Sequence, residues 1–387
     1  MTTAYIHDAV RTPRGKARRD GGLASLKPQH MVAGLIEGLE RRGAVERPPD
    51  ALVLGAVGQV GAQGGNIALV SKLHSGLPDS VAAWSLNNYC VSSLTAIGQA
   101  AGMVAAGNAS TVLAGGVEMM SRVPFMADNA DFYADAEFTR RTRYIPVALA
   151  ADRLADREGV TRPEMDGAAL ESNTRALAAE ATGLVASRLP TNGLDRDECA
   201  RLITEDSLAR LPPAFGPLAK QHAEALAGQS FEHRHTVAHA PPMSDGAALA
   251  LVTASAEEKC RARVMAYAES GGDPEASLTA GLTAAHLALK RAGIRLKDVD
   301  RIEFMEAFAV AIVLFLRNPE VDSEKVNVGG GHLAKGHPMG ATGAILLSSL
   351  LDALDVCEGR IGLVVASGAH GVGCALVIER LASGPGR

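Results

Sequence analysis

Hydrophobic and polar residues alternate in two recurring patterns along the first part of the chain. Short apolar runs, typical of buried strands, cover residues 3–10, 51–57, 82–87 and 110–117. Between these runs the apolar side chains recur at helical spacing, over residues 28–42, 66–76 and 92–107. Gly43 and Gly76 stand where two of these helices are expected to end. Strands that alternate with helices predict an α/β fold with a mostly parallel sheet.

The same alternation returns in the last part of the chain, after a region of different composition. Residues 119–239 carry more charged side chains and proline clusters, so we expect an inserted region of helices and loops. Beyond it, the expected strands cover residues 247–253 and 301–306 and two segments within 362–378, and the expected helices cover 274–292 and 340–354. In each block one special residue, Cys90 or His337, precedes a helix of small side chains, which suggests a duplicated fold.

Composition excludes several classes of function. Thirty-eight Lys and Arg against 43 Asp and Glu give a formal charge of −5, so the chain lacks the basic excess of nucleic-acid or acidic-membrane binders. The longest apolar run, residues 307–316, is too short to span a bilayer, and the N-terminus carries no secretory signal. Five scattered cysteines without a C-x-x-C pair indicate neither a disulfide framework nor a zinc site. We therefore expect a cytoplasmic protein that acts on small molecules.

Two short segments carry clustered polar residues. Residues 11–19 hold five basic residues in nine positions, and we expect a solvated loop, the alternative being a contact with a phosphate group. His233, His235 and His239 lie close together in the sequence, but no carboxylate or cysteine follows at the spacing of a metal site. We expect a surface or substrate-contacting loop there and no metal.

Cys90 is the first candidate for catalysis, because it stands between an expected strand and an expected helix. The positive end of a helix dipole favours a thiolate, so the pKa of this thiol is expected to fall below its usual value of about 8.5. A thiol of that kind is a nucleophile at neutral pH. The alternative is that Cys90 is a small buried hydrophobic residue.

His337 is the second candidate. It lies in a glycine-rich segment, residues 329–343, at the start of an expected helix, where an imidazole can act as a general base or donate to an oxyanion. The segment contains no G-K-[ST], and no G-x-G-x-x-G follows a strand, so a nucleotide-binding loop is not expected.

Several motifs resemble those of the thiolase family in their order and spacing. They are Asp-Ala-Val-Arg-Thr-Pro at 8–13, Asn87 with Cys90 and Ser92, Ala-Gly-Gly-Val-Glu-Met-Met-Ser at 114–121, Ser-Asp-Gly-Ala-Ala at 244–248, Glu-Ala-Phe-Ala at 306–309 and Gly-His-Pro-x-Gly-Ala-x-Gly at 336–343. The resemblance implies a thiolase fold of two similar β-α-β-α-β-α-β-β halves in α-β-α-β-α layers, with an inserted loop domain that covers coenzyme A. The expected divisions are residues 1–118 with 240–256, the insertion 119–239, and 257–387.

The resemblance also implies an activity and a set of site residues. The residue that matches Cys90 takes an acyl group from an acyl-CoA, the match of His337 activates that thiol, and a second cysteine near the C-terminus deprotonates the other substrate. Coenzyme A is then a substrate, no cofactor is permanently bound, and homodimers or homotetramers are expected. The residues expected to contact coenzyme A are Met305, Glu306, Phe308, Gly368 and His239.

This chain departs from the family pattern near the second substrate. Ser367 occupies the position of the second cysteine, and a serine hydroxyl is a much weaker acid than a thiol. Ser367 itself and His370 are the candidates to replace that cysteine in catalysis, whereas Cys374 is expected to be a core residue. Met305 replaces a polar residue that helps to hold the oxyanion-hole water in the family, and Pro241 replaces a serine of the pantetheine-binding loop.

These observations leave two main functions open, and hydrolysis of the acyl-enzyme to a free acid is a minor third one. The first is an acyltransferase that forms an acyl-enzyme at Cys90 and passes the acyl group to an acceptor, through Claisen or thiolytic chemistry or with an altered second half-reaction. The second is a catalytically impaired thiolase-like protein that binds acyl-CoA or a partner enzyme. Retention of Cys90 and His337 favours the enzyme.

Overall fold

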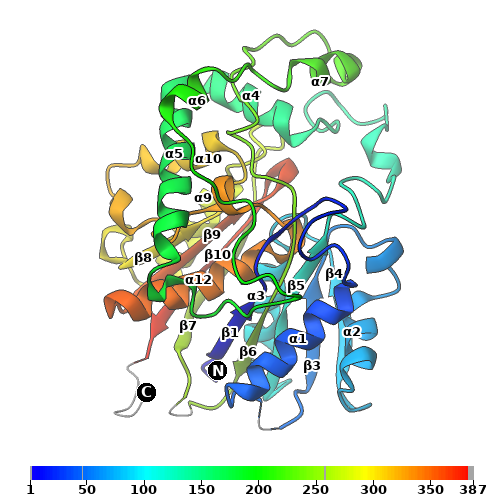
Figure 1. Ribbon diagram of the computed structural model, residues 1–387, viewed down its shortest axis with the longest axis vertical. Coiled ribbons are helices and arrows are strands. Elements are labelled where there is room, and N and C mark those ends of the chain that lie inside the picture. The colour runs from blue at the N-terminus through cyan, green and yellow to red at the C-terminus, as the bar shows by residue number, and fades with distance from the viewer. Residues whose placement is uncertain (1, 46, 257–258, 382–387) are drawn as a thin grey trace.

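The computed structural model describes residues 2–45, 47–256 and 259–381. Its strands join into a ten-stranded sheet in the order β4-β3-β5-β6-β1-β7-β10-β9-β8, with β2 paired to β6 (Figure 1). The strands are β1 (Tyr5–Arg11), β2 (Gly15–Lys16), β3 (Ala51–Gly55), β4 (Ala82–Leu86), β5 (Thr111–Met119), β6 (Ser244–Thr253), β7 (Ala262–Gly271), β8 (Arg301–Phe304), β9 (Ile361–Ser367) and β10 (Val372–Arg380).

Helices connect and cover these strands. Those of the two sheet-bearing blocks are α1 (Pro28–Arg41), α2 (Ile67–Ser75), α3 (Ser92–Ala105), α9 (Ala280–Ala292), α10 (Ala309–Leu316), α11 (His332–Lys335) and α12 (Thr342–Cys357). Those between β5 and β6 are α4 (Val147–Arg157), α5 (Arg162–Ala179), α6 (Glu205–Ala209), α7 (Gly216–Gln221) and α8 (Ala223–Leu226). Short 3-10 turns are η1 (Gly61–Gln63), η2 (Asp131–Tyr133), η3 (Gly183–Val185), η4 (Leu296–Asp298), η5 (Ser323–Lys325), η6 (Met339–Ala341) and η7 (Ala369–Gly371).

The sheet consists of two halves with a short junction. Strands β1 and β7 pair only through Tyr5 with Arg263 and Ile6 with Ala262, so β4-β3-β5-β6-β1 and β7-β10-β9-β8 form separate halves. Strand β3 runs parallel to β4 and β5, and β8 runs parallel to β9, whereas the other pairings are antiparallel. The expectation of a mostly parallel sheet is therefore wrong, because the alternation of strands and helices does not reveal which strands become neighbours.

The helices form three layers around the two halves. Helices α1 and α2 pack on the outer face of the first half, and α9 packs on the second half against β7, β9 and β10. Between the halves lie α3, which contacts β3 and β5 on one side and β7 and β10 on the other, and α12, which contacts β1 and β6 as well as β8 and β9. The expected α-β-α-β-α layering of two similar halves is thereby confirmed.

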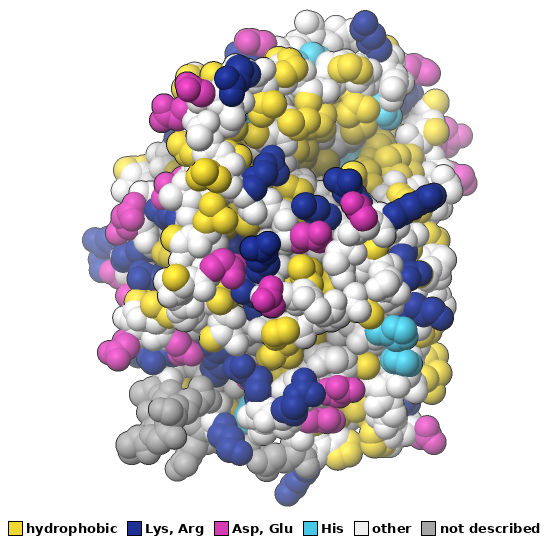
Figure 2. Space-filling view, in the orientation of Figure 1, with side chains coloured by type: hydrophobic (Ala, Val, Ile, Leu, Met, Phe, Trp, Pro, Cys, Tyr) yellow, Lys and Arg dark blue, Asp and Glu magenta, His cyan; other side chains and the backbone are white. Residues whose placement is uncertain are grey.

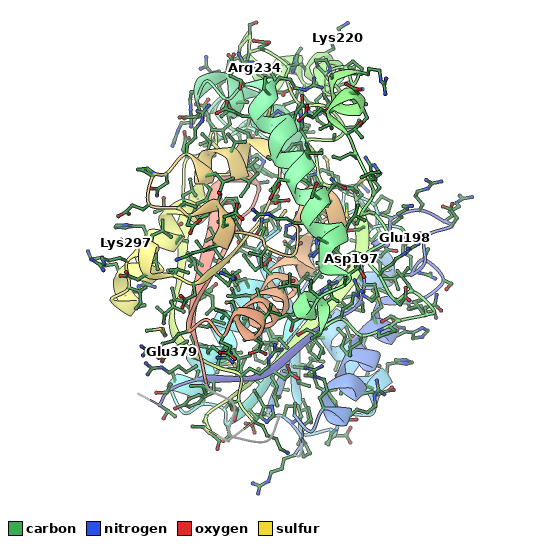
Figure 3. All side chains as sticks on the ribbon, turned by 60° about the vertical axis from the view of Figure 1, so that its left-hand side comes forward. Asp197, Glu198, Lys220, Arg234, Lys297 and Glu379 are labelled. Carbon is green, nitrogen blue, oxygen red and sulfur yellow. The ribbon has the colours of Figure 1, made fainter. Side chains whose placement is uncertain are left out.

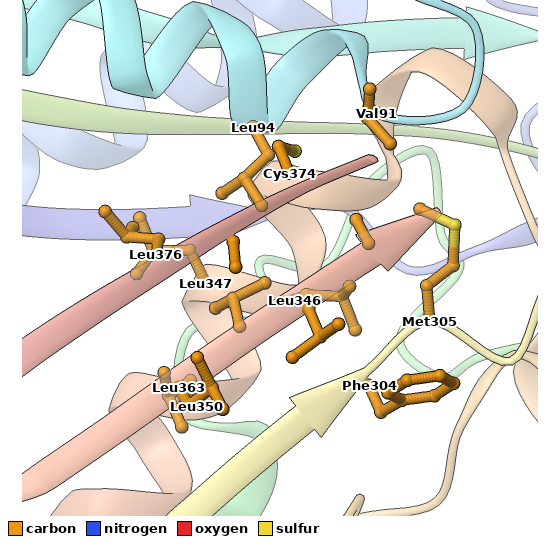
Figure 4. Close-up of a cluster of buried hydrophobic side chains, with 14 of the residues drawn as sticks. Val91, Leu94, Phe304, Met305, Leu346, Leu347, Leu350, Leu363, Cys374 and Leu376 are labelled. Carbon is orange, nitrogen blue, oxygen red and sulfur yellow. The ribbon is translucent and has the colours of Figure 1, made fainter. Parts of the chain in front are cut away.

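The middle helix layer is held by hydrophobic packing. Leu94 of α3 and Leu346, Leu347 and Leu350 of α12 are buried among the side chains of β9 and β10 (Figure 4). Each such side chain contributes about 1.5–3 kcal/mol when it is fully buried. The apolar stretch Met339–Cys357 is long enough to cross a membrane, but 78% of its most apolar window is buried inside the protein. It is a core helix here, which explains its composition.

The segment between β5 and β6 builds the upper part of the molecule in Figure 1, where α4, α6 and α7 lie beyond the ends of the strands. A small hydrophobic cluster of its own, with Ile145, Leu149, Ala150 and Leu226, holds α4 against α8. Helices and loops prevail in its described residues, as its charged and proline-rich composition predicts.

Several element predictions differ from the structure, most clearly at β7, α9 and β8. Strand β7 was not predicted, because Arg263 and Glu269 interrupt its apolar pattern. Helix α9 begins at Ala280 rather than at residue 274, since the residues before it form turns. Strand β8 ends at Phe304, so Met305 and Glu306 lie beyond it.

Candidate active site

Cys90 lies in a tight turn that connects β4 to α3. Tyr89 has a φ of 47°, which is a strained conformation for an aromatic residue, and hydrogen bonds on both sides compensate for it. The Asn87 side chain accepts from the Tyr89 N–H at 2.9 Å, and the Ser92 hydroxyl donates to the Tyr89 carbonyl at 2.6 Å. The turn therefore holds Cys90 in one position at the start of α3.

The pKa of Cys90 is raised to about 12, chiefly by burial and also by the nearby carboxylate of Glu118. Backbone N–H groups of Cys90 and Ala369 hydrogen-bond to the sulfur and oppose the rise without cancelling it. The expectation of a thiolate at rest is wrong, because burial and the Glu118 carboxylate raise the pKa of Cys90 by more than the N–H groups at the helix N-terminus lower it. Cys90 is a neutral thiol that needs a base.

His337 lies in the loop between α11 and α12, and its backbone is fixed from two sides. Its N–H donates to the Pro242 carbonyl at 2.9 Å, and the guanidinium of Arg14 donates to the Gly336 carbonyl at 2.9 Å. Gly336 has a φ of 97°, and a Cβ there would lie 2.7 Å from the Ser244 hydroxyl oxygen, so only glycine fits. The turn into His337 thus depends on this glycine.

The imidazole of His337 is buried and has one bonded and one unbonded nitrogen. Nδ1 lies 2.8 Å from the Thr342 hydroxyl, whereas Nε2 has no protein partner among the described residues. Burial, together with Arg14, lowers the pKa of His337 to about 3, so the ring is neutral at pH 7. A neutral ring whose Nδ1–H donates to Thr342 leaves the Nε2 lone pair free to accept a proton.

Arg14 belongs to a buried ion cluster behind His337. The Arg11 guanidinium forms a bidentate pair with Asp197 at 2.7 and 2.9 Å. The backbone N–H of Arg14 donates to the same carboxylate at 3.0 Å. Asp197 lies beside the C-terminal end of α5 (Figure 3). Burial alone would raise the pKa of Asp197, but Arg11 and Arg14 hold it well below its usual range. The expectation of a solvated basic loop is wrong for these two arginines.

Glu118 is a further candidate site residue, which no pattern in the sequence indicates. Its fully buried carboxylate accepts hydrogen bonds from the N–H groups of Val57, Gly58 and Gly340 and from the Gln63 amide, at 2.6–3.1 Å. These donors come from the loop after β3, from η1 and from the segment that follows His337. A Cβ on Gly340 would lie 2.8 Å from the Glu118 carboxylate, so the contact requires glycine. Glu118 and Gly340 lie far apart in the sequence, so no local pattern indicates this contact.

Cys90 and His337 both line one cavity of about 620 Å³. Its walls are mainly apolar and come from the loop before α4, from α7, from residues 240–243 and from Phe308. A hollow bordered by hydrophobic side chains lies below α7 on the face seen in Figure 2. The structure thus brings three of the predicted site residues, Cys90, His337 and Phe308, to one space.

Met305 and Glu306 do not line this cavity. Met305 is buried and packs in the hydrophobic core beside Phe304 (Figure 4). The Glu306 carboxylate accepts from the Ser172 hydroxyl at 2.8 Å, from the Asn327 amide at 2.9 Å and from the Leu333 N–H at 3.0 Å. The structure places Met305 in the core and makes Glu306 a support of the glycine-rich loop, and the expected contacts of both residues with coenzyme A stay a prediction.

The C-terminal candidates, Ser367, Gly368 and His370, lie at the end of β9 and in the turn that follows it. A Cβ on Gly368 would lie 3.5 Å from the Cys90 nitrogen, which places the end of β9 against the Cys90 turn. The Ser367 hydroxyl oxygen accepts from the Gly281 N–H at 2.9 Å, at the start of α9. The His370 ring packs among aromatic rings, with centroids 5.1 Å from Tyr144 and 6.3 Å from Tyr89. Neither side chain lines the large cavity.

The three histidines before β6 are held by carboxylates within the insertion. His239 is fully buried, and its Nε2 lies 2.8 Å from Asp166. Nδ1 atoms of His233 and His235 lie 2.8 and 2.7 Å from the two oxygens of Asp152. The His239 ring is used inside the fold and the neighbouring Pro241 lines the cavity, so the expected contact of His239 with coenzyme A stays a prediction.

Comparison with known proteins agrees with this architecture. Residues 4–256 match the family model described as the N-terminal domain of thiolase, and residues 258–380 match that of the C-terminal domain. The chain is 33% identical over 404 residues to a 3-ketoacyl-CoA thiolase of Citrobacter koseri, covering 99% of this chain and all of that protein. It is 32% identical over 403 residues to a steroid 3-ketoacyl-CoA thiolase of Mycobacterium tuberculosis, covering 98% and 95%.

A solved structure is also similar throughout. The crystal structure of the Bacillus anthracis acetyl-CoA acetyltransferase matches with a TM-score of 0.84 and 28% identity, over 98% of this chain and 99% of that one. Fold and comparisons together define the class as that of acyl-transferring enzymes. The chain belongs to the thiolase family. The predictions of the fold and of an acyltransferase are thereby confirmed.

The role of Glu118 predicts opposite effects on stability and on thiol reactivity. A Glu118→Gln variant keeps the shape but turns an amide NH₂ toward buried N–H donors, which should lower the free energy of unfolding by about 1–3 kcal/mol. Removal of the negative charge should lower the pKa of Cys90, so alkylation by iodoacetamide at pH 8 should become faster. Urea unfolding and alkylation rates check the two effects, with Cys90→Ala/Glu118→Gln as the control for other thiols. A folded variant with unchanged or slower alkylation contradicts this role.

Proposed function

We propose that this chain is an acyl-CoA C-acyltransferase that forms its acyl-enzyme at Cys90, with His337 as the general base. The observation that carries the proposal is the opening of both residues onto one cavity, with the His337 Nε2 atom unpartnered. A buried, neutral imidazole beside a neutral thiol is suited to proton transfer, because the two groups need no charge until a substrate arrives.

In the first half-reaction, His337 Nε2 takes the Cys90 proton and the sulfur attacks the thioester carbon of an acyl-CoA. The oxygen of the tetrahedral intermediate faces the N–H groups of Cys90 and Ala369, which already point at the sulfur. The bond between this carbon and the coenzyme A sulfur then breaks, and the departing thiolate takes the proton from Nε2. Thr342 holds Nδ1–H throughout and keeps the ring in the required tautomer.

Coenzyme A acts in this proposal as a substrate that binds and leaves. The apolar cavity of about 620 Å³ has the size of a site for a drug-sized ligand and suits a pantetheine arm, with Phe308 and Pro241 in its wall. A catalytic thiol requires reducing conditions, so we place the reaction in the cytoplasm.

We further propose that the second half-reaction proceeds without a second catalytic cysteine. Ser367 stands at the end of β9, next to the Cys90 turn, where the family pattern has a cysteine. Cys374 is completely buried in β10 among apolar side chains (Figure 4), and burial raises its pKa well above the usual range. The Cys260 thiol donates to the Ser255 carbonyl in the connection between β6 and β7. An acceptor that is already nucleophilic fits this arrangement.

Formation of the acyl-enzyme is tested by intact mass. Incubation with acetyl-CoA should add one acetyl group to the protein, and peptide mapping should find it on Cys90. Cys90→Ala should abolish the adduct, and His337→Ala should slow its formation by about 10²–10⁴-fold. Cys357→Ala, at the end of α12, is the matched thiol control and should load normally. Loading that persists in Cys90→Ala contradicts the proposal.

The role of position 367 is tested by a pair of variants. Ser367→Cys should raise the rate of acetoacetyl-CoA thiolysis at least tenfold over the natural protein, because a thiol is a stronger acid toward the departing enolate. Ser367→Ala is the control and should show no such gain. The rates are measured in the presence of coenzyme A from the loss of the acetoacetyl-CoA enolate absorbance. Fast thiolysis by the natural protein contradicts the altered second step.

We also propose a homodimer formed through β4. This strand pairs with β3 on one side and ends the sheet on the other, and it carries the partly exposed Trp84. An apolar edge strand is a ready template for pairing with a second copy of the chain. The Cys90 turn follows this strand directly, so pairing at the edge would also support the site.

The dimer is tested by sedimentation velocity. The natural protein should sediment as a dimer or a larger even-numbered oligomer, and Trp84→Lys should shift it toward monomer, because a charge at the paired edge is unfavourable. Val356→Lys replaces an exposed apolar residue on α12 and should leave the oligomer intact. A monomeric natural protein, or a Trp84→Lys protein that remains fully dimeric, contradicts edge pairing.

A further inference from the structure

Two cavities of very different size meet at Cys90. Besides the large cavity, a smaller and more enclosed one of about 40 Å³ is lined by Tyr89, Met126, Tyr133, Tyr144 and Ala369. Cys90, Phe125, Met126, Val147 and Met339 line both cavities. Cys90 therefore stands at the boundary between an open space and a more enclosed one.

The catalytic groups divide between the two cavities. His337 lines the large cavity, whereas Ala369, whose N–H donates to the Cys90 sulfur, lines the small one. The departing coenzyme A sulfur must be close to His337 Nε2 to receive its proton, so it leaves through the large cavity. The rest of the acyl group then extends to the other side of the sulfur, into the small cavity.

The volume of the small cavity limits the length of the acyl group. A water-sized group needs about 10–15 Å³ by this measure, so 40 Å³ holds on the order of three such groups. This is room for an acyl group of roughly two to four carbons. Longer chains would have to displace the wall.

The wall is built from rings that support one another. The ring centroids of Tyr133 and Tyr144 lie 4.8 Å apart. The ring of His370 packs on both Tyr144 and Phe132, with centroid distances of 5.1 and 5.4 Å. The Tyr144 hydroxyl also contacts the Met126 sulfur at 3.2 Å. Displacing one ring disturbs its neighbours, so the wall resists expansion. His370 thus has a place in the structure as a buttress of this wall.

The small cavity also disfavours a negative charge. Asp128 lines it, and its two carboxylate oxygens accept from the Tyr133 hydroxyl at 3.0 and 2.9 Å. An acyl group that ends in a carboxylate would be enclosed next to this carboxylate, and none of the described residues in the wall of the cavity has a cationic side chain.

Resting on the proposed acyl-enzyme, we infer that this enzyme transfers a short, uncharged acyl group of roughly two to four carbons, which the wall formed by Tyr133, Tyr144 and Met126 selects. The open cavity then receives the larger reaction partner.

A series of donors tests the inference. Rates of adduct formation on Cys90 are measured by intact mass with acetyl-, butyryl-, octanoyl- and malonyl-CoA. Acetyl and butyryl groups should load readily, octanoyl should load at least about tenfold more slowly, and malonyl should give no adduct. Tyr133→Ala should raise the octanoyl rate relative to the acetyl rate by about tenfold, because it lengthens the cavity. Phe138→Ala, which removes a ring that contacts Phe132 but does not line the cavity, should not.

Three other outcomes would contradict these expectations. Octanoyl loading as fast as acetyl loading in the natural protein overturns the inference and leaves the acyl-enzyme intact. Equal effects of Tyr133→Ala and Phe138→Ala overturn the assignment of the wall. Circular dichroism shows whether Tyr133→Ala keeps its fold, and Tyr133→Val is used in its place if it does not. Absence of an adduct with all four donors contradicts the proposed function and the inference with it.

Discussion

The buried carboxylate of Glu118 is the interaction on which the site depends. It accepts four hydrogen bonds, three from backbone N–H groups and one from Gln63, and so connects the loop after β3 with Gly340, three residues beyond His337. A buried charge is tolerated when all its hydrogen bonds are made, and breaking such a set is costly. Because the two sheet halves share few direct pairings, this contact and the packing of α3 and α12 fix the distance between the Cys90 turn and His337.

The same burial determines the resting state of the two reacting groups. Desolvation and Glu118 raise the pKa of Cys90 to about 12, and desolvation and Arg14 lower that of His337 to about 3, so neither group is charged at pH 7. Charge would therefore appear on these two groups only during the reaction, when the N–H groups of Cys90 and Ala369 are placed to receive it. A neutral thiol and a neutral imidazole also suit the apolar walls of the large cavity.

Local sequence patterns predicted much of this arrangement. The alternation of strands and helices identified the α/β class, and the positions of Cys90 and His337 before small-residue helices identified the pair that shares the cavity. What escaped prediction depends on residues far apart in the chain. The burial of Arg11 and Arg14 requires Asp197, the rise in the Cys90 pKa requires Glu118, and the core position of Met305 requires β9, where the Val365 carbonyl accepts from the Met305 N–H. No local pattern carries these contacts, because each forms only when the segments pack together.

The most direct test of the proposed mechanism is the structure of a crystal of the protein soaked with acetyl-CoA. The mechanism predicts an acetyl group on the Cys90 sulfur, with its carbonyl oxygen at the N–H groups of Cys90 and Ala369 and its methyl group in the cavity lined by Tyr133 and Tyr144. An unmodified Cys90 with coenzyme A bound, an acetyl group on another residue, or a methyl group pointing into the large cavity would contradict it.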